Sequence, residues 1–167
     1  MKLGIDIGIK NYALCLLGAD NEILEWNVYD LTEPINDSLH YNGKFDIIHV
    51  SKNLNKIFKN LFDKYNPELI DVIIENQLPM GSNSIIMKSI QAMTTQIMTL
   101  YNIENIKYIG GKTKLKGYDV HQQTYAQRKK SCVAVVKSLI RENELIQLNE
   151  FGKKKDDLCD CYLIALL

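Results

Sequence analysis

The chain of 167 residues carries no net charge, because 20 lysines and arginines balance 20 aspartates and glutamates. A strongly basic chain would indicate a nucleic-acid partner by its composition alone. In this chain, a basic surface that binds nucleic acid could arise only from local clustering of lysines and arginines. The balance of charge therefore assigns no partner.

Long hydrophobic runs are also missing. The longest uncharged run lies between Lys88 and Glu104, and it is too short and too rich in Gln, Ser, Thr and Asn to span a bilayer. The opening MKLGIDIG passes directly into strand pattern, without the charged, apolar and small-residue order of a secretory signal. We therefore expect no membrane partner, no secretion and a cytoplasmic location.

Metal-binding cysteine patterns are absent as well. Cys15, Cys132, Cys159 and Cys161 form no C-x-x-C pair and have no histidine cluster beside them, which argues against a zinc site. We expect these cysteines to be reduced and mostly buried. No Ser/His/Asp or Cys/His set for covalent catalysis is apparent either.

The sequence does contain clear changes of hydrophobic period. Residues 2–8, 12–17 and 23–29 are β-prone and closely connected, which predicts an antiparallel meander, and residues 30–46 have the composition of a long loop. After residue 46, segments in which apolar residues recur every three or four positions, typical of helices, alternate with short apolar runs, typical of strands. The later predicted elements are helix 51–66, strand 69–74, helix 84–101, strand 106–109, and helices 128–144 and 156–167.

This order predicts the fold class. Three antiparallel strands followed by helices that alternate with strands indicate an α/β fold, with a mixed sheet covered by helices on both faces. The length suits one domain that spans residues 1–167.

Acidic residues occupy unexpected places in these elements. Asp6 lies within the first strand, Glu75 closes the fourth, and the last helix opens with DDLCD, residues 156–160. Ends of neighbouring parallel strands are where open α/β sheets place their sites, so we expect these carboxylates to converge. Spacing alone allows either Asp157 or Asp156 to share a helical face with Asp160.

Converging carboxylates repel one another unless cations neutralise them. Their hard oxygen atoms favour Mg²⁺ or Mn²⁺, and two such ions can activate a water and stabilise the leaving oxygen in phosphodiester hydrolysis. Gly8 would let the chain turn without crowding the ions. Each acid also has a simpler explanation: Asp6 paired with a lysine, Glu75 solvated, or Asp156 or Asp157 as a helix N-cap.

Three segments together resemble a known family. GIDIGIKNYALCLL, VIIENQ and KKKDDLCDCYLIALL are similar to the RuvC-type Holliday-junction resolvases of the ribonuclease H-like superfamily, and YAQRKKS is closest to the poxvirus branch. The resemblance implies a ribonuclease H-like five-stranded sheet. It also implies a Mg²⁺-dependent endonuclease that resolves Holliday junctions and other branched DNA, in recombination and in viral replication intermediates. The alternative is a junction-binding scaffold of the same fold without catalysis.

The family's site residues map onto this sequence by motif. The resemblance assigns the metal ligands, two ions per site, to Asp6, Glu75, Asp157 and Asp160, since the apolar CYLIALL matches the family helix only in that register. It places a catalytic lysine at Lys114, with Lys112 and Lys116 as neighbouring candidates and a second family lysine at Lys130.

A basic segment near the acids predicts a DNA-binding surface. Residues 107–130 hold seven basic side chains, at Lys107, Lys112, Lys114, Lys116, Arg128, Lys129 and Lys130, against Asp119 alone. Tyr118 is positioned to stack on exposed bases or simply to anchor the loop. Asn76 and Gln77 follow Glu75 and either position DNA or cap the next helix.

The helix at 84–101 has a wide apolar stripe. Its members are Ile85, Ile86, Met87, Ile90, Met93, Ile97, Met98, Leu100 and Tyr101. A stripe wider than one core-facing surface predicts a homodimer contact, which suits a junction with two-fold symmetry, although a fully buried helix would look similar.

Overall fold

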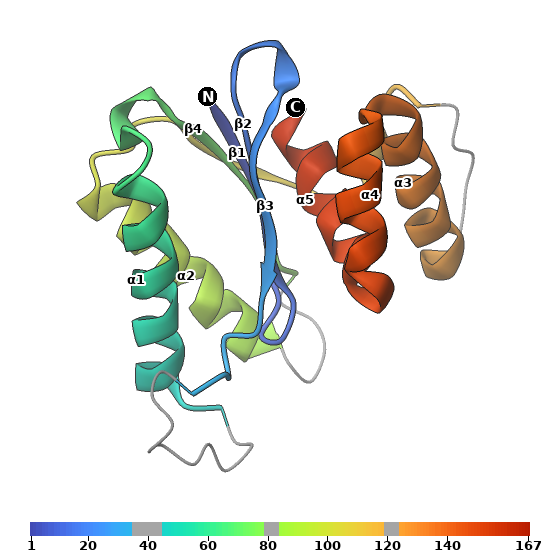
Figure 1. Cartoon of the computed structure of the whole chain (residues 1–167). Coiled ribbons are helices and arrows are strands. Elements are labelled where there is room, and N and C mark those ends of the chain that lie inside the picture. Colours follow the sequence, from blue (N-terminus) through green and yellow to red (C-terminus); the bar gives the residue numbers. More distant parts are fainter. Residues whose placement is uncertain (35–44, 79–83, 119–123) are drawn as a thin grey trace.

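A computed structural model of the chain describes residues 1–34, 45–78, 84–118 and 124–167, apart from the side chains of Tyr125 and Lys153. It contains a five-stranded sheet in the order β3-β2-β1-β4-β5 (Figure 1). The strands are β1 (Lys2–Asp6), β2 (Tyr12–Leu17), β3 (Ile23–Tyr29), β4 (Asp71–Glu75) and β5 (Ile106–Ile109). Pairing is antiparallel from β1 to β3, and parallel between β1 and β4 and between β4 and β5. The predicted mixed sheet is confirmed.

Helices cover both faces of this sheet, as predicted. Helices α1 (Ile47–Phe62) and α2 (Ser84–Leu100) lie on one side, and α3 (Tyr125–Leu139), α4 (Glu142–Glu150) and α5 (Lys155–Ala165) lie on the other (Figure 1). Within the four described ranges, no helix has the length and apolar character needed to cross a bilayer.

Alternation along β1 assigns its residues to the two faces. Leu3 and Ile5 are fully buried in the core under α1 and α2, whereas Gly4 faces α5. A Cβ at Gly4 would lie 2.2 Å from the carbonyl oxygen of Cys161 and 2.4 Å from the backbone nitrogen of Ala165. The missing side chain therefore lets α5 pack directly against β1.

A second buried cluster fixes the position of α5 along the sheet. Trp26 on β3 donates its indole N–H to the carbonyl oxygen of Leu158 at 2.9 Å, and its ring packs 5.7 Å from that of Tyr162. The four cysteines are free and buried, as expected, and all four belong to this cluster. The cluster holds the start of α5 near the carboxyl end of β1.

Several predicted helix and strand boundaries were wrong. The helix expected at 128–144 is two helices, α3 and α4, and the break between them is stabilised by the Arg141 N–H, which donates to the Glu144 carboxylate at 2.7 Å. The first helix begins at Ile47 rather than residue 51, because Asp46 caps it by accepting from the N–H groups of Ile48 and His49.

The fourth strand starts at Asp71 rather than residue 69, since Pro67–Leu69 forms a 3₁₀ turn. Asp6 is the last residue of β1, not an interior one, because β1 ends two residues earlier than predicted. The expected loop at 30–46 lies mostly outside the described residues, which resume at Phe45.

Candidate active site

A cavity of about 490 Å³ opens at the carboxyl ends of β1 and β4. Its lining comes from β1, the β1–β2 turn, β4, the turn after β5, α3 and α5. All four predicted metal ligands and the predicted catalytic lysine belong to that lining: Asp6, Glu75, Lys114, Asp157 and Asp160. Residues from both ends of the chain thus meet in one cavity.

The parallel pairing of β1 with β4 brings the first two acids together. Ile5 pairs with Ile74, so Asp6 and Glu75 are the next residues along both strands. Asp6 shares a strand face with Gly4, the face on which α5 packs. Burial, followed by the nearby Glu75 carboxylate, raises the pKa of Asp6 well above its usual value.

Lys114 lies among these acids. Its ammonium is 2.9 Å from Oε2 of Glu75 and 2.7 Å from Oδ2 of Asp160, and the residue is only 8% exposed. Burial alone would lower the pKa of Lys114, but the carboxylates of Asp160, Asp6 and Glu75 outweigh it and raise that pKa above its ordinary value. The lysine is therefore held in its charged form.

The start of α5 supplies the other two acids. Asp157 and Asp160 line the cavity, whereas Asp156 pairs with Lys129. Lys129 also lies 3.7 Å from Asp157. Burial and the neighbouring Asp156 charge raise the pKa of Asp157 to about 6. Of the two pairs that spacing left open, the structure places Asp157 and Asp160 in the cavity.

These residues fit the predicted divalent ions. Four carboxylates supply hard oxygen ligands, and Oδ1 of Asp160 is buried with no hydrogen-bond partner among the described residues. As the side chains lie, no three His, Cys, Asp or Glu residues of the described chain enclose a metal position. The ammonium of Lys114 instead bridges two of the carboxylates.

Two glycines shape the cavity wall. A Cβ at Gly111 would lie 2.5 Å from Oε1 of Glu75, so this position must remain open for the glutamate. A Cβ at Gly8 would meet the carbonyl oxygen of Asn11 at 2.6 Å. The tight turn after β1 therefore requires a glycine at position 8, which agrees with the predicted role in the turn, and Gly8 also lines the cavity.

The predicted DNA-binding residues divide into two groups. Gln77, Arg128 and Lys129 line the cavity. Lys112, Lys116 and Lys130 are exposed and do not line it.

Two other predicted contacts lie away from the cavity wall. The side-chain oxygen of Asn76 accepts a hydrogen bond from the Lys88 ammonium at 3.0 Å. Tyr118 lines a separate pocket with Arg141 and Tyr162 and packs against the cluster around α5. This placement corresponds to the anchoring role considered for Tyr118.

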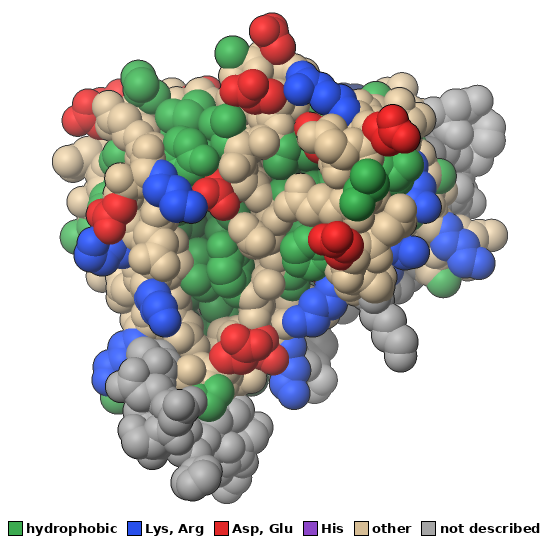
Figure 2. Space-filling view, in the orientation of Figure 1, with side chains coloured by type: hydrophobic (Ala, Val, Ile, Leu, Met, Phe, Trp, Pro, Cys, Tyr) green, Lys and Arg blue, Asp and Glu red, His purple; other side chains and the backbone are tan. Residues whose placement is uncertain are grey.

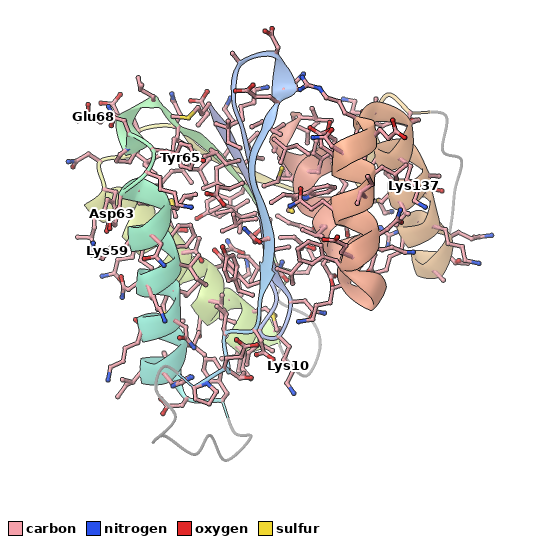
Figure 3. The ribbon with its side chains drawn as sticks, viewed as in Figure 1. Lys10, Lys59, Asp63, Tyr65, Glu68 and Lys137 are labelled. Carbon is pink, nitrogen blue, oxygen red and sulfur yellow. The ribbon has the colours of Figure 1, made fainter. Side chains whose placement is uncertain are left out.

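The sequence reasoning missed Lys10 and Asn11. Both lie in the turn between β1 and β2 and line the cavity together with the α3 residues Arg128 and Lys129. Lys10 is exposed and extends from this turn (Figure 3). The short connection after an acidic strand end was the available signal, because such a turn must lie beside that acid.

The apolar stripe of α2 is used mostly inside the molecule. Seven of its nine residues pack in or against the core under α1 and α2. Ile85 and Leu100 remain, at 79% and 71% exposed. The wide stripe is therefore explained largely by the core, and the surface left for a homodimer is narrower than the sequence suggested.

Comparison with known proteins now identifies the class. The fold resembles three solved resolvase structures, each with about the whole of this chain covered. The yeast mitochondrial Holliday junction resolvase Ydc2 has a TM-score of 0.67 at 24% identity, over 98% of this chain and 76% of that one. RuvC from Thermus thermophilus has a TM-score of 0.60 at 13% sequence identity, over 99% of this chain and 90% of that one. The fowlpox virus resolvase, solved with its Holliday junction DNA, has a TM-score of 0.57 at 22% identity, over 99% of this chain and 96% of that one.

The fold is thus that of the RuvC-like resolvases. A sequence relative, the mitochondrial cruciform cutting endonuclease 1 of Schizosaccharomyces pombe, is 26% identical over 98% of this chain and 75% of its own length. The family model described as "Poxvirus A22 protein" matches residues 2–167, and the chain belongs to that family. The predicted poxvirus-type resemblance is confirmed.

Proposed function

We propose that this protein is a divalent-metal-dependent endonuclease that resolves Holliday junctions and other branched DNA. The observation that carries the proposal is the meeting of Asp6, Glu75, Asp157 and Asp160 in one cavity of a resolvase fold. The named activities of the relatives support the same conclusion. Since the chain belongs to a poxvirus family, the substrates that we propose are branched intermediates of viral DNA replication and recombination in the cytoplasm.

The four acids would hold two Mg²⁺ or Mn²⁺ ions, which activate a water and stabilise the leaving oxygen during phosphodiester hydrolysis. Asp6 and Glu75 contribute from rigid strand ends, and Asp157 and Asp160 contribute from one face of α5. Lys114 supplies positive charge for the phosphate as negative charge develops on it. Because the four acids lie on strands and a helix rather than on loops, their positions relative to one another are fixed.

The cavity wall provides the groups that would bind DNA. Lys10, Arg128 and Lys129 place positive charge in the same cavity as the four acids. Such a pattern suits a phosphate backbone that crosses the cavity. On the face drawn in Figure 2, acidic and basic side chains are interspersed, and no large patch of one charge stands out.

The other predicted contacts remain part of the proposal. Lys112, Lys116 and Lys130 are exposed and free to approach DNA arms outside the cavity. Gln77 would contact DNA at the cavity, with Asn76 next to it in the chain. We also propose a homodimer through the exposed residues Ile85 and Leu100 of α2, which would present two cavities to the two related strands of a junction.

A four-way junction assay tests the function. Wild-type protein should bind a synthetic junction and nick paired strands only when Mg²⁺ or Mn²⁺ is added. Asp6→Asn should bind the junction equally well and cut it roughly a thousandfold more slowly, because one ligand carboxylate is lost without a change in shape. Unchanged cleavage by Asp6→Asn would refute the metal assignment, and binding without cleavage by the wild type would favour the scaffold.

A further inference from the structure

Lys114 is in an unusual environment for a lysine. Its ammonium contacts Glu75 and Asp160 together, and its side chain is 9% exposed. The surface pair of Lys59 and Asp63 on α1 shows the contrast, since those side chains are 66% and 61% exposed and water competes for both (Figure 3). The Lys114 bridge is shielded from such competition.

One ammonium does not neutralise the acids around it. Asp160, Asp6 and Glu75 all act electrostatically on Lys114, and Oδ1 of Asp160 stays buried without a hydrogen-bond partner among the described residues. A purely structural ion pair would leave no excess of carboxylate. The cavity therefore contains more acceptor capacity and more negative charge than its lysine can satisfy.

On the basis of the function proposed above, we propose that Lys114 is a built-in cation of the metal-free site, which divalent ions must displace from Glu75 and Asp160. A divalent ion next to those two carboxylates and a lysine ammonium between them would repel each other strongly at such short range. Binding of the ions and release of the lysine are therefore one event. The released side chain, with four methylene groups, is free to turn toward a phosphate above the cavity.

Metal binding by charge-removing variants tests this competition without DNA or turnover. Calorimetric titration with Mn²⁺ compares the wild type with Lys114→Met, which keeps the length of the side chain and loses the ammonium. Removal of the competitor should tighten Mn²⁺ binding at least about tenfold, which corresponds to one modest charge interaction. The rise in melting temperature on addition of Mn²⁺ should also be larger for Lys114→Met.

Lys10→Met is the matched control. Lys10 lines the same cavity but is exposed and lies outside the ion pairs of Lys114 with Glu75 and Asp160, so the Lys10→Met variant measures the general effect of one positive charge. Its Mn²⁺ affinity should stay within about twofold of wild type, because solvent screens an exposed charge. An equal increase in Mn²⁺ affinity in Lys114→Met and Lys10→Met would overturn the proposal that the ions displace Lys114.

Two failures can be told apart. If the wild type binds Mn²⁺ and Lys114→Met binds it no more tightly, the displacement is wrong and the proposed nuclease site stands. If neither protein binds Mn²⁺, the proposed function and the displacement are both overturned.

Amine labelling of the wild type gives a second test that requires no variant to fold. Lys114 should resist an amine-reactive reagent in metal-free protein, because it is buried and charged. Its labelling, followed by peptide mass spectrometry, should rise severalfold when saturating Mn²⁺ is added, while labelling of Lys10 stays constant. Unchanged protection of Lys114 at saturation would overturn the proposal.

Discussion

The face of the sheet under α1 and α2 packs aliphatic and aromatic side chains, whereas the face under α5 also holds Lys114 and four acids at one end. The strand β1 serves both faces. Ile5 is fully buried in the first core, and the next residue, Asp6, points to the cavity. Because successive side chains of a strand point to opposite faces, Ile5 contributes to stability while the adjacent Asp6 takes part in the proposed chemistry.

This comparison has a direct energetic meaning. An apolar side chain such as Ile5 stabilises the fold by burial, and no ligand is needed for that effect. The acids at this end instead cost free energy, because burial and then the neighbouring Glu75 carboxylate raise the pKa of Asp6, and the Lys114 ammonium offsets part of that cost. The acids on the α5 face therefore lower the stability of the fold, and the apolar core under α1 and α2 compensates for this loss.

The largest expected contrast comes from Ile5→Ala and Asp6→Asn. Ile5→Ala should lower the free energy of unfolding by about 3 kcal/mol and leave cleavage per folded molecule close to wild type. Asp6→Asn should slow cleavage roughly a thousandfold and raise the metal-free stability by about 1 kcal/mol, because the folded state favours the neutral form of that side chain. Urea denaturation without metal and junction cleavage check both effects. A lower stability of Asp6→Asn would contradict the assignment of stability to Ile5 and of the proposed chemistry to Asp6.

Gly4→Ala tests the contact that brings the two ends of the chain together. The added methyl would overlap the backbone of α5 at Cys161 and Ala165, so α5 must move away from β1. We expect a loss of about 3 kcal/mol in unfolding free energy, together with reduced Mn²⁺ affinity, because Asp160 moves with the helix. Gly117→Ala is the control, since a Cβ there meets nothing within 4 Å, and only its positive φ of 96° adds strain. Equal loss of Mn²⁺ affinity in both variants would exclude a specific α5 contact.

A smaller effect is expected at Gly111, which affects one carboxylate rather than a helix. Gly111→Ala places a methyl against Oε1 of Glu75 and should slow cleavage about tenfold, with a melting temperature within a few degrees of wild type. Gly110→Ala next to it is the control, because its Cβ has only one ordinary contact, 3.8 Å from the Thr113 hydroxyl. Equal cleavage by Gly111→Ala and wild type would show that the position of Glu75 is not critical.

The pH dependence of metal binding should respond to Asp156. Since the pKa of Asp157 is about 6, Asp157 becomes protonated as the pH falls through that value, and Mn²⁺ affinity should decline there. Asp156→Asn removes a like charge and frees Lys129 to pair with Asp157, so the decline should move to lower pH by about half a unit. Glu104→Gln, an exposed change outside the cavity, should leave the profile unchanged. A shift to higher pH in Asp156→Asn would contradict the electrostatic account.

The smallest expected effect is on DNA affinity at the rim. Lys10→Ala should weaken junction binding only a few-fold and reduce the slope of log affinity against log salt by about one. Lys52→Ala on the exposed side of α1 is the matched control and should change neither quantity. An unchanged slope for Lys10→Ala would remove this turn from the DNA surface.

The sequence predicted the fold where the pattern was periodic. The alternation in β1, the short connections to β3 and the later helix–strand alternation were enough for the mixed sheet. The break between α3 and α4 was missed because the apolar period continues through Leu139 and Ile140, and no glycine or proline marks it. The start of α1 was missed although Asp46, a common N-cap residue, stands directly before it.

The site could be predicted only in part. Strand ends and helical spacing identified the acids but left Asp156 and Asp157 as alternatives. The family resemblance favoured Asp157, and the packing of α5 shows that Asp156 pairs with Lys129 while Asp157 lines the cavity. The family resemblance favoured Lys114 but kept Lys112 and Lys116 as neighbouring candidates, because the 3₁₀ turn at Thr113–Leu115, which buries Lys114, was not predicted from the sequence. Lys10 was missed although the short connection that follows Asp6 places its turn beside that acid.

Anomalous scattering from a crystal soaked in Mn²⁺ tests the central claim most directly. We predict manganese peaks inside the cavity, bound by carboxylates from β1, β4 and α5, with Lys114 moved away from Glu75 and Asp160. Manganese found only on the outer surface, with the Lys114 bridge intact at saturating metal, would contradict the claim that these acids form a divalent-ion site.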